Sequence, residues 1–209
     1  MPIDSLPDLG ASAGVLQTWI LPALLGLGLA SATGLRTFMP LLMLAIAARF
    51  GLFGISLNEQ MGWLVSTPAI AALGVAAVVE FAGDKIPVLD HGLSAMGVFI
   101  RPIAGAVAAA SVFAGLDPTT AAIAGVIVGA PTALAFNAAQ GGTRLASTAT
   151  TGGLGNPILS FIEDVLSFFT VLLAFVAPIL IPIAMILVAV LVFRLANRLR
   201  GRAEDVPSF

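Results

Sequence analysis

Length, composition and charge set the class of this protein. The chain has 209 residues, of which 59% are hydrophobic and only 10% are charged. Because a soluble domain carries about 25% charged residues, we expect the outer face of this protein to contact lipid. The net charge is −2 and no basic patch precedes the last dozen residues, which argues against nucleic-acid binding. The chain has no cysteine, which excludes disulfides and thiolate metal sites.

The chain begins with a short polar tail. The opening residues, MPIDSLPDLG, include acidic residues but no Lys or Arg. They lack the basic region of a secretory signal, so residues 1–13 are predicted to be a retained N-terminal tail. Residues 14–199 are predicted to form the transmembrane helical domain, and residues 200–209 a cytoplasmic C-terminal tail.

Seven continuous apolar runs follow the tail, and each is predicted to be a helix. Transmembrane strands alternate apolar and polar residues, whereas these runs are unbroken and rich in Ala and Leu. About 20 apolar residues cross a bilayer, so the second and third runs are short and can be tilted, broken or partly re-entrant. Pro178 and Pro182 would break one long helix, which predicts a tight turn before the last run. The runs cover residues 14–33, 38–53, 67–82, 94–114, 119–139, 157–176 and 179–197.

The basic residues predict the orientation, because Lys and Arg collect in cytoplasmic loops. With seven spans and the N-terminus outside, only Arg49 of the nine basic residues lies on the outer side. Six spans with an internal N-terminus remain an alternative if one short run does not cross. The fold class is therefore an all-α polytopic membrane helix bundle of about seven transmembrane helices, with the C-terminus inside. In the seven-span topology the cytoplasmic side holds the other eight basic residues, Arg36, Lys85, Arg101, Arg144, Arg194, Arg198, Arg200 and Arg202.

A Gly-x-Arg string occurs twice, as Gly-Leu-Arg at 34–36 and Gly-Thr-Arg at 142–144, each after a stretch of small residues. Transporters are often built from internal repeats. In the predicted topology the two strings would belong to a parallel repeat. The alternative is two unrelated helix ends that each carry an inner arginine.

An acidic pair, Glu163 and Asp164, stands inside the sixth apolar run. Glu163 is about six residues into its helix, roughly 9 Å from the start. A carboxylate at mid-membrane costs about 2.5–3.5 kcal/mol, and less near the edge. The pair can contact an ion, a proton or a substrate. Alternatively, the first turns of this helix lie among lipid headgroups, where acidic residues favour the N-terminal dipole.

The segment over residues 140–157, QGGTRLASTATTGGLGNP, is almost entirely Gly, Ser, Thr and Ala, with Arg144 as its single charge. A plain cytoplasmic loop usually carries more charge. Free amides and hydroxyls can receive an ion, and irregular backbone at membrane depth is tolerated where it lines a wet cavity. We therefore predict a Gly/Ser/Thr-rich loop that can be re-entrant, with Thr151 and Asn156 on the pathway; the alternative is a flexible linker.

Glu80 lies near the end of the third run, on the predicted inner side with Arg36, Arg144 and Glu163. A membrane-buried charge needs a partner, so these four side chains are predicted to form a charge-balanced cluster, which Arg101 can join. The alternative is an ion-pair cluster that only ties helices together.

The sequence contains no recognisable enzyme motif. The single histidine, His91, follows Asp84 and Asp90, but one His with scattered carboxylates matches no zinc or iron spacing. That segment is interpreted as a solvated loop. We predict no catalytic residue, no metal site and no cofactor.

Several strings together resemble a family of bacterial membrane proteins that is catalogued only as a domain of unknown function. They are Gly-Leu-Arg at 34–36 with Pro40, EFAGDKIP at 80–87, FIRP at 99–102, and GGLGNP at 152–157 with the acidic pair at 163–164. The resemblance covers most of the chain, apart from the first dozen residues and the C-terminal tail. It implies a multi-helix inner-membrane protein and no particular reaction.

The predicted function is a small transporter or channel of the bacterial inner membrane, not an enzyme. Its partners are the lipid bilayer and a small ion or solute, with a homo-oligomer as an option. One alternative is a protein that binds or flips a lipid or polyprenyl phosphate through its headgroup; another is an accessory subunit without a pathway. The residues predicted to line the pathway are Arg36, Glu80, Arg101, Asn137, Arg144, Thr151, Asn156, Glu163 and Asp164.

Overall fold

A computed structural model of the chain describes residues 13–84, 87–190 and 194, with side chains for 13–84, 96–190 and 194. Every element in this part is a helix. The predicted tails and the side chains of Lys85, Asp90 and His91 lie outside the described residues. In chain order the elements are η2 (Leu16–Ile20), α2 (Leu21–Leu35), α3 (Phe38–Arg49), η3 (Leu52–Gly54), η4 (Glu59–Val65), α4 (Thr67–Gly83), α5 (Pro87–Ser111), α6 (Pro118–Thr151), α7 (Asn156–Val176), η5 (Pro178–Leu180) and a last helix over residues 181–190.

The all-helical class is confirmed, and the membrane character is supported in part. Among the described residues, three helices are long and apolar enough to cross a membrane: Ala13–Leu35, Pro118–Thr151 and Asn156–Val176. A fourth crossing results if η4 and α4, which meet at a 65° bend, form one span. The other apolar helical stretches with described side chains, Phe38–Arg49, Met96–Ser111 and Pro178–Val190, are each shorter than 18 residues.

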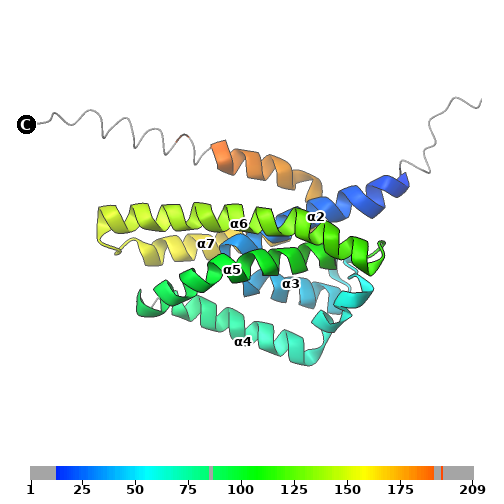
Figure 1. Cartoon of the computed structure of the whole chain (residues 1–209), viewed down its shortest axis with the longest axis horizontal. Helices are drawn as coiled ribbons and strands as arrows, with labels where there is room; N and C mark the ends of the chain where they lie inside the picture. Colours follow the sequence, from blue (N-terminus) through cyan, green and yellow to red (C-terminus); the bar gives the residue numbers. More distant parts are fainter. Residues whose placement is uncertain (1–12, 85–86, 191–193, 195–209) are drawn as a thin grey trace, which may run out of the picture.

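Successive long helices run back and forth along the bundle. The end of α4, the start of α5 and the α6–α7 turn lie at one end (left in Figure 1). The η3–η4 connection, the start of α6 and the end of α7 lie at the opposite end. We call these the α6–α7 end and the η4 end. The predicted break near Pro178 is confirmed, because α7 ends at Val176 and η5 follows.

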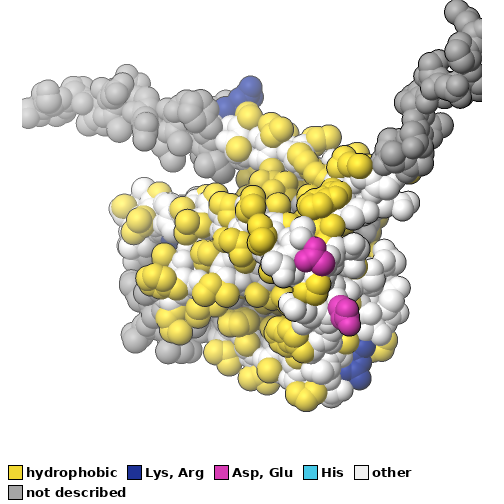
Figure 2. Space-filling model, turned by 45° about the vertical axis from the view of Figure 1, so that its right-hand side comes forward, with side chains coloured by type: hydrophobic (Ala, Val, Ile, Leu, Met, Phe, Trp, Pro, Cys, Tyr) yellow, Lys and Arg dark blue, Asp and Glu magenta, His cyan; other side chains and the backbone are white. Residues whose placement is uncertain are grey.

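The centre of the bundle is closed by small residues on α5 and α6. A Cβ atom added at Gly125 would lie 2.5 Å from both Cβ and N of Ala110, and one at Gly129 would collide with the backbone of Gly105. Gly125 and Gly129 are one helical turn apart, so they form the small-residue stripe that lets helix backbones approach in membranes. Many large apolar side chains are exposed, and hydrophobic side chains are spread over the face shown in Figure 2.

Local sequence decides where two helices begin. Ser66 accepts a hydrogen bond from the amide of Ala69 at the start of α4, and Asp117 accepts from the amides of Thr119 and Thr120 at the start of α6. Each has Pro as the next or second-next residue, as expected at a helix N-terminus. Hydrogen bonds from Thr120 lower the pKa of the exposed Asp117 carboxyl.

The predicted irregular loop over residues 140–157 is wrong. Helix α6 continues to Thr151, and only residues 152–155 form a turn, with left-handed backbone at Gly152 (φ +62°) and Gly153 (φ +90°). The hydroxyls of Thr148 and Thr151 bond to carbonyls four residues earlier, those of Arg144 and Ser147. Because the polar side chains are satisfied within the helix, a Thr-rich segment can remain helical.

Candidate functional site

The site is built around a break in the chain between α2 and α3. Arg36 occupies this break in an extended conformation (φ −136°, ψ 119°), and its side chain is only 2% exposed. Gly34 permits the close packing that buries it, because a Cβ atom there would lie 2.5 Å from the carbonyl oxygen of Ala133. The Gly-Leu-Arg string therefore places a guanidinium inside the bundle.

Arg36 is surrounded by acceptors from α7 and from the residue after α4. It forms an ion pair with Asp84 and another with Asp164, with 2.7 Å between Nε and Oδ1. Its Nη2 lies 3.6 Å from Glu163 Oε2 and donates to the carbonyl oxygen and the hydroxyl of Ser160 at 2.7 and 2.8 Å. The acidic pair of the sixth run thus faces an arginine inside the bundle.

Arg144 on α6 binds two of the same carboxylates. Its Nη2 lies 2.6 Å from Glu163 Oε2 and 3.1 Å from Asp84 Oδ2, and its Nε donates to Glu163 Oε1 at 3.3 Å. The arginines of the two Gly-x-Arg strings, Arg36 and Arg144, therefore share Asp84 and Glu163. We call Arg36, Asp84, Arg144, Glu163 and Asp164 the charge cluster.

Buried polar residues connect the charge cluster to the end of α2. Gln140 donates to Glu163 Oε2 at 2.6 Å and to the carbonyl oxygen of Leu35 at 3.2 Å. Arg101 on α5 donates through Nη1 to the carbonyl oxygen of Gly34 at 3.1 Å, to Asn137 at 2.8 Å and to Gln140. Positive charge and amide donors at a helix C-terminus satisfy carbonyls that have no partner within the helix.

Glu80 borders the charge cluster and contacts the backbone at the start of α3. It forms no ion pair with a described residue; instead its two carboxylate oxygens accept the amides of Thr37 and Phe38, at 2.8 and 3.1 Å. A carboxylate is stabilised at the N-terminus of α3 by these free amides and by the helix dipole. The backbone on both sides of Arg36 is thus held by side chains from α4, α5 and α6.

The structure brings together most of the predicted pathway residues, with two exceptions. Arg36, Arg101, Asn137, Arg144, Glu163 and Asp164 form one connected network, and Glu80 borders it through the backbone. Thr151 and Asn156 lie apart from it, at the α6–α7 turn. There Thr151 accepts a hydrogen bond from the amide of Gly155, and Asn156 donates to Thr148. They were assigned to a loop that is in fact a helix and a short turn.

Three members of the network were not predicted. Asp84, interpreted from the sequence as part of a solvated loop, is only 6% exposed and contacts both arginines of the charge cluster. Gln140 and Ser160 are also buried. Helical spacing could have found them, because Asp84 is four residues after Glu80, Gln140 four before Arg144, and Ser160 three before Glu163.

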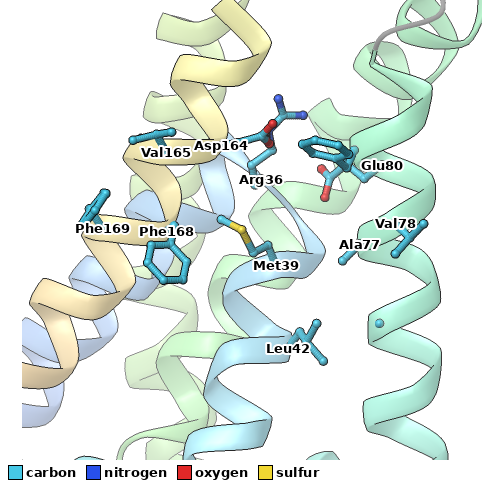
Figure 3. A pocket seen from close by; sticks show the side chains of 12 residues that line it. Arg36, Met39, Leu42, Ala77, Val78, Glu80, Asp164, Val165, Phe168 and Phe169 are labelled. Carbon is cyan, nitrogen blue, oxygen red and sulfur yellow. Dashed lines mark ion pairs between the residues drawn. The ribbon is translucent and has the colours of Figure 1, made fainter.

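A cavity of about 420 Å³ adjoins the charge cluster between α3, α4 and α7. Figure 3 shows Arg36, Glu80 and Asp164 at one end of it, with Leu42, Val78, Phe168 and Phe169 along its walls. Gly74 leaves space in the α4 wall, since nothing lies within 4 Å of a Cβ added there. The cavity is therefore apolar along its length and charged at one end.

The described residues contain no group of three His, Cys, Asp or Glu side chains able to hold a metal ion. Of the weak candidate set at Asp84, Asp90 and His91, only the Asp84 side chain is described, and it pairs with arginines. The carboxylates of the charge cluster are thus bound to guanidinium groups.

The fold and the site define an all-helical protein with membrane-compatible helices and a buried arginine–carboxylate network. The chain belongs to the family described as Domain of unknown function (DUF4126), whose model matches residues 23–198. The predicted family resemblance is thereby confirmed. No curated protein and no solved structure matches the chain.

Proposed function

We propose that this chain is a small transporter of the bacterial inner membrane, with the charge cluster as a gate near the cytoplasmic side. The proposal includes seven crossings, an external N-terminus and a cytoplasmic C-terminus. The observation that carries it is the sharing of Asp84 and Glu163 by Arg36 and Arg144.

Shared carboxylates make a buried ion-pair network able to rearrange. Removing one partner from a buried pair costs about 3–5 kcal/mol, because an uncompensated charge remains. Here a helix movement that separates Arg36 from Asp84 leaves Asp84 paired with Arg144, and Arg36 paired with Asp164. Two arrangements of the same charges can therefore have similar free energies, which alternating access requires.

Position also supports a gate. The charge cluster joins the break before α3, the end of α4, the last third of α6 and the first half of α7. Ionisable residues in membrane helices commonly mark ion and substrate pathways, since burying them without a role is costly. A cluster that contacts this many helices can couple the movement of one helix to another.

The test is ion flux through vesicles that contain the purified full-length chain. Potassium, chloride, phosphate and proton fluxes are measured for the wild type, for Glu163→Gln in the charge cluster, and for Glu59→Gln at an exposed carboxylate of η4. We expect flux above that of protein-free vesicles, a loss of at least tenfold in Glu163→Gln, and no loss in Glu59→Gln. Vesicles as tight as protein-free ones, or equal flux in Glu163→Gln, contradict the proposal.

A second candidate function, lipid binding or flipping, is supported by the cavity between α3, α4 and α7. Its apolar length and charged end suit an amphipathic molecule that enters from the bilayer, and 420 Å³ is within the usual range for ligand sites. Scrambling of a fluorescent phospholipid tests it. We expect Gly74→Leu, which fills the cavity, to abolish scrambling, and Gly62→Leu, in open space on η4, to leave it unchanged. Equal scrambling in both variants contradicts this function.

A further inference from the structure

The connection between α3 and α4 presents an apolar surface away from the bundle. Four large side chains of this connection, Phe50, Leu52, Phe53 and Trp63, are each between 45% and 69% exposed. They come from the residue after α3, from η3 and from η4. We call these four residues the η3–η4 surface. A set of large apolar side chains exposed on one short connection calls for a partner that covers it.

The inward side of the same connection holds this surface in place. Ile55 and Leu64 are buried, and the amide of Asn58 donates to the carbonyl oxygen of Ser111 at 2.7 Å. The side-chain amide of Asn58 donates to the carbonyl oxygen of Phe113 at 3.1 Å. The connection is thus packed on the end of α5, and this packing sets the outward direction of the η3–η4 surface.

Charged and polar side chains border the η3–η4 surface. Glu59 and Gln60 at the start of η4 are exposed, and so is Arg49 at the end of α3. Arg49 donates to the carbonyl oxygen of Val65 at 3.1 Å and to the hydroxyl of Thr67 at 2.9 Å. Large apolar and charged side chains thus stand within a few residues of each other. The headgroup region of a bilayer accommodates both kinds, whereas the hydrocarbon interior and bulk water each accommodate only one.

Both tryptophans of the chain lie at this end of the bundle. Trp63 belongs to the η3–η4 surface, and Trp19 on η2 lines a hollow with Phe113 and Thr120 beside the start of α6. Trp19 is also exposed. Because indole combines an apolar ring with a polar N–H, tryptophan is enriched at membrane–water interfaces. The two tryptophans therefore favour lipid headgroups over a protein as the partner of this surface.

We infer that the η3–η4 surface, together with Trp19, binds the headgroup region of a lipid bilayer. Residues 50–65 then lie along the membrane surface, between α3 and α4, and do not project into water. The inference rests on the membrane location in the proposed function and is independent of transport. It gives the η3–η4 connection a function of its own, as the anchor of the bend between η4 and α4.

The test measures the depth of each tryptophan in liposomes that contain the full-length chain. Trp19→Phe leaves Trp63 as the single indole, and Trp63→Phe leaves Trp19. Bromine quenches indole fluorescence on contact, so the liposomes contain phosphatidylcholine brominated either near the headgroup end or near the methyl end of its acyl chains. Acrylamide is the quencher in the water. We expect each indole to lose more fluorescence to bromine near the headgroup than to the deep bromine, and less to acrylamide than free tryptophan loses.

Ile127→Trp, in a chain whose two native tryptophans are replaced by Phe, is the matched control. Ile127 is exposed on α6, ten residues after Asp117. A rise of 1.5 Å per residue places it about 15 Å from the η4 end, which is near the centre of a bilayer with about 30 Å of hydrocarbon. We expect the opposite order for this indole, with stronger quenching by the deep bromine.

Two results overturn the headgroup contact. Quenching of Trp63 by acrylamide as strong as that of free tryptophan means that the η3–η4 surface faces water. Weak quenching of Trp63 by acrylamide and by both brominated lipids means that a protein contact covers it. The membrane location fails separately, because the Ile127→Trp indole is then quenched by neither lipid. Transport is not measured in this experiment, so the absence of ion flux leaves the inference intact.

Discussion

Arg144 and Glu163 are joined by two contacts, 2.6 Å between Nη2 and Oε2 and 3.3 Å between Nε and Oε1. The two residues are 19 positions apart in the sequence and lie on either side of the α6–α7 turn. They stand on α6 and α7, which run in opposite directions (Figure 1). These two helices make few other contacts along their length. The pair is therefore a principal link between them at the α6–α7 end.

Glu163→Gln and Glu163→Ala separate charge from hydrogen bonding in this pair. Gln keeps an acceptor for Gln140 and Arg144, whereas Ala removes it and leaves Arg144 with Asp84 and Gln140 with the carbonyl oxygen of Leu35. We expect Ala to lower the free energy of unfolding by about 3–5 kcal/mol and Gln to lower it by less. Detergent unfolding followed by tryptophan fluorescence measures both. If the Gln variant is absent from the membrane, Glu163 is structural and the transporter proposal loses its main support.

Asp84→Asn tests the residue that sequence interpretation placed in a solvated loop. Its carboxylate contacts Arg36 and Arg144 while being only 6% exposed. Removing a charge shared by two buried guanidiniums should lower the free energy of unfolding by several kcal/mol, on the order of 3–5. Asp117→Asn, at an exposed helix cap, is the control and should have a much smaller effect. Equal stability changes in the two variants would mean that Asp84 is solvated.

Gly125→Val tests the close approach of α5 and α6. A Cβ atom at Gly125 would lie 2.5 Å from Ala110, so the helices must separate to admit any side chain. We expect the variant to lose most folded protein in size-exclusion chromatography. By contrast Gly141→Ala, at an open position inside α6, should be neutral or more stable, by up to about 1 kcal/mol. A well-folded Gly125→Val protein would show that the two helices are not in contact.

Single-cysteine labelling tests the two ends of the bundle, and the lack of native cysteine makes it direct. Thr151 and Gln60 are exposed at opposite ends, whereas Ser160 is buried beside Arg36. We expect an impermeant thiol reagent to label Thr151→Cys only in inverted vesicles and Gln60→Cys only in right-side-out cells, with Ser160→Cys slow in both. Labelling of Thr151→Cys and Gln60→Cys from the same side would contradict the proposed topology.

A reporter fused after Phe209 tests the same topology independently. The positive-inside rule predicts that a reporter active only in the cytoplasm will work there and that a periplasmic one will not. The same reporter fused before Met1 distinguishes seven crossings, with the N-terminus outside, from six crossings, with the N-terminus inside. A periplasmic signal from the C-terminus would invalidate the orientation.

The sequence by itself determined the helical class, the positions of most helix boundaries and the family. Long apolar runs leave the backbone to satisfy its own hydrogen bonds, which a helix does within one segment. Residues such as Ser66, Asp117 and Pro178 mark ends through bonds or steric limits that reach only a few residues. These are local interactions, so a local pattern is enough to predict them.

Only the tertiary structure decided which charges meet. Asp84 and Thr151 both lie in polar stretches of the sequence, yet one is buried between two arginines and the other is exposed at a turn. Likewise Glu80 was predicted to pair with arginine but holds the amides of α3 instead. The reason is physical: the cost of burying a charge depends on partners from distant helices, and helix packing, set by small residues such as Gly34 and Gly125, selects those partners.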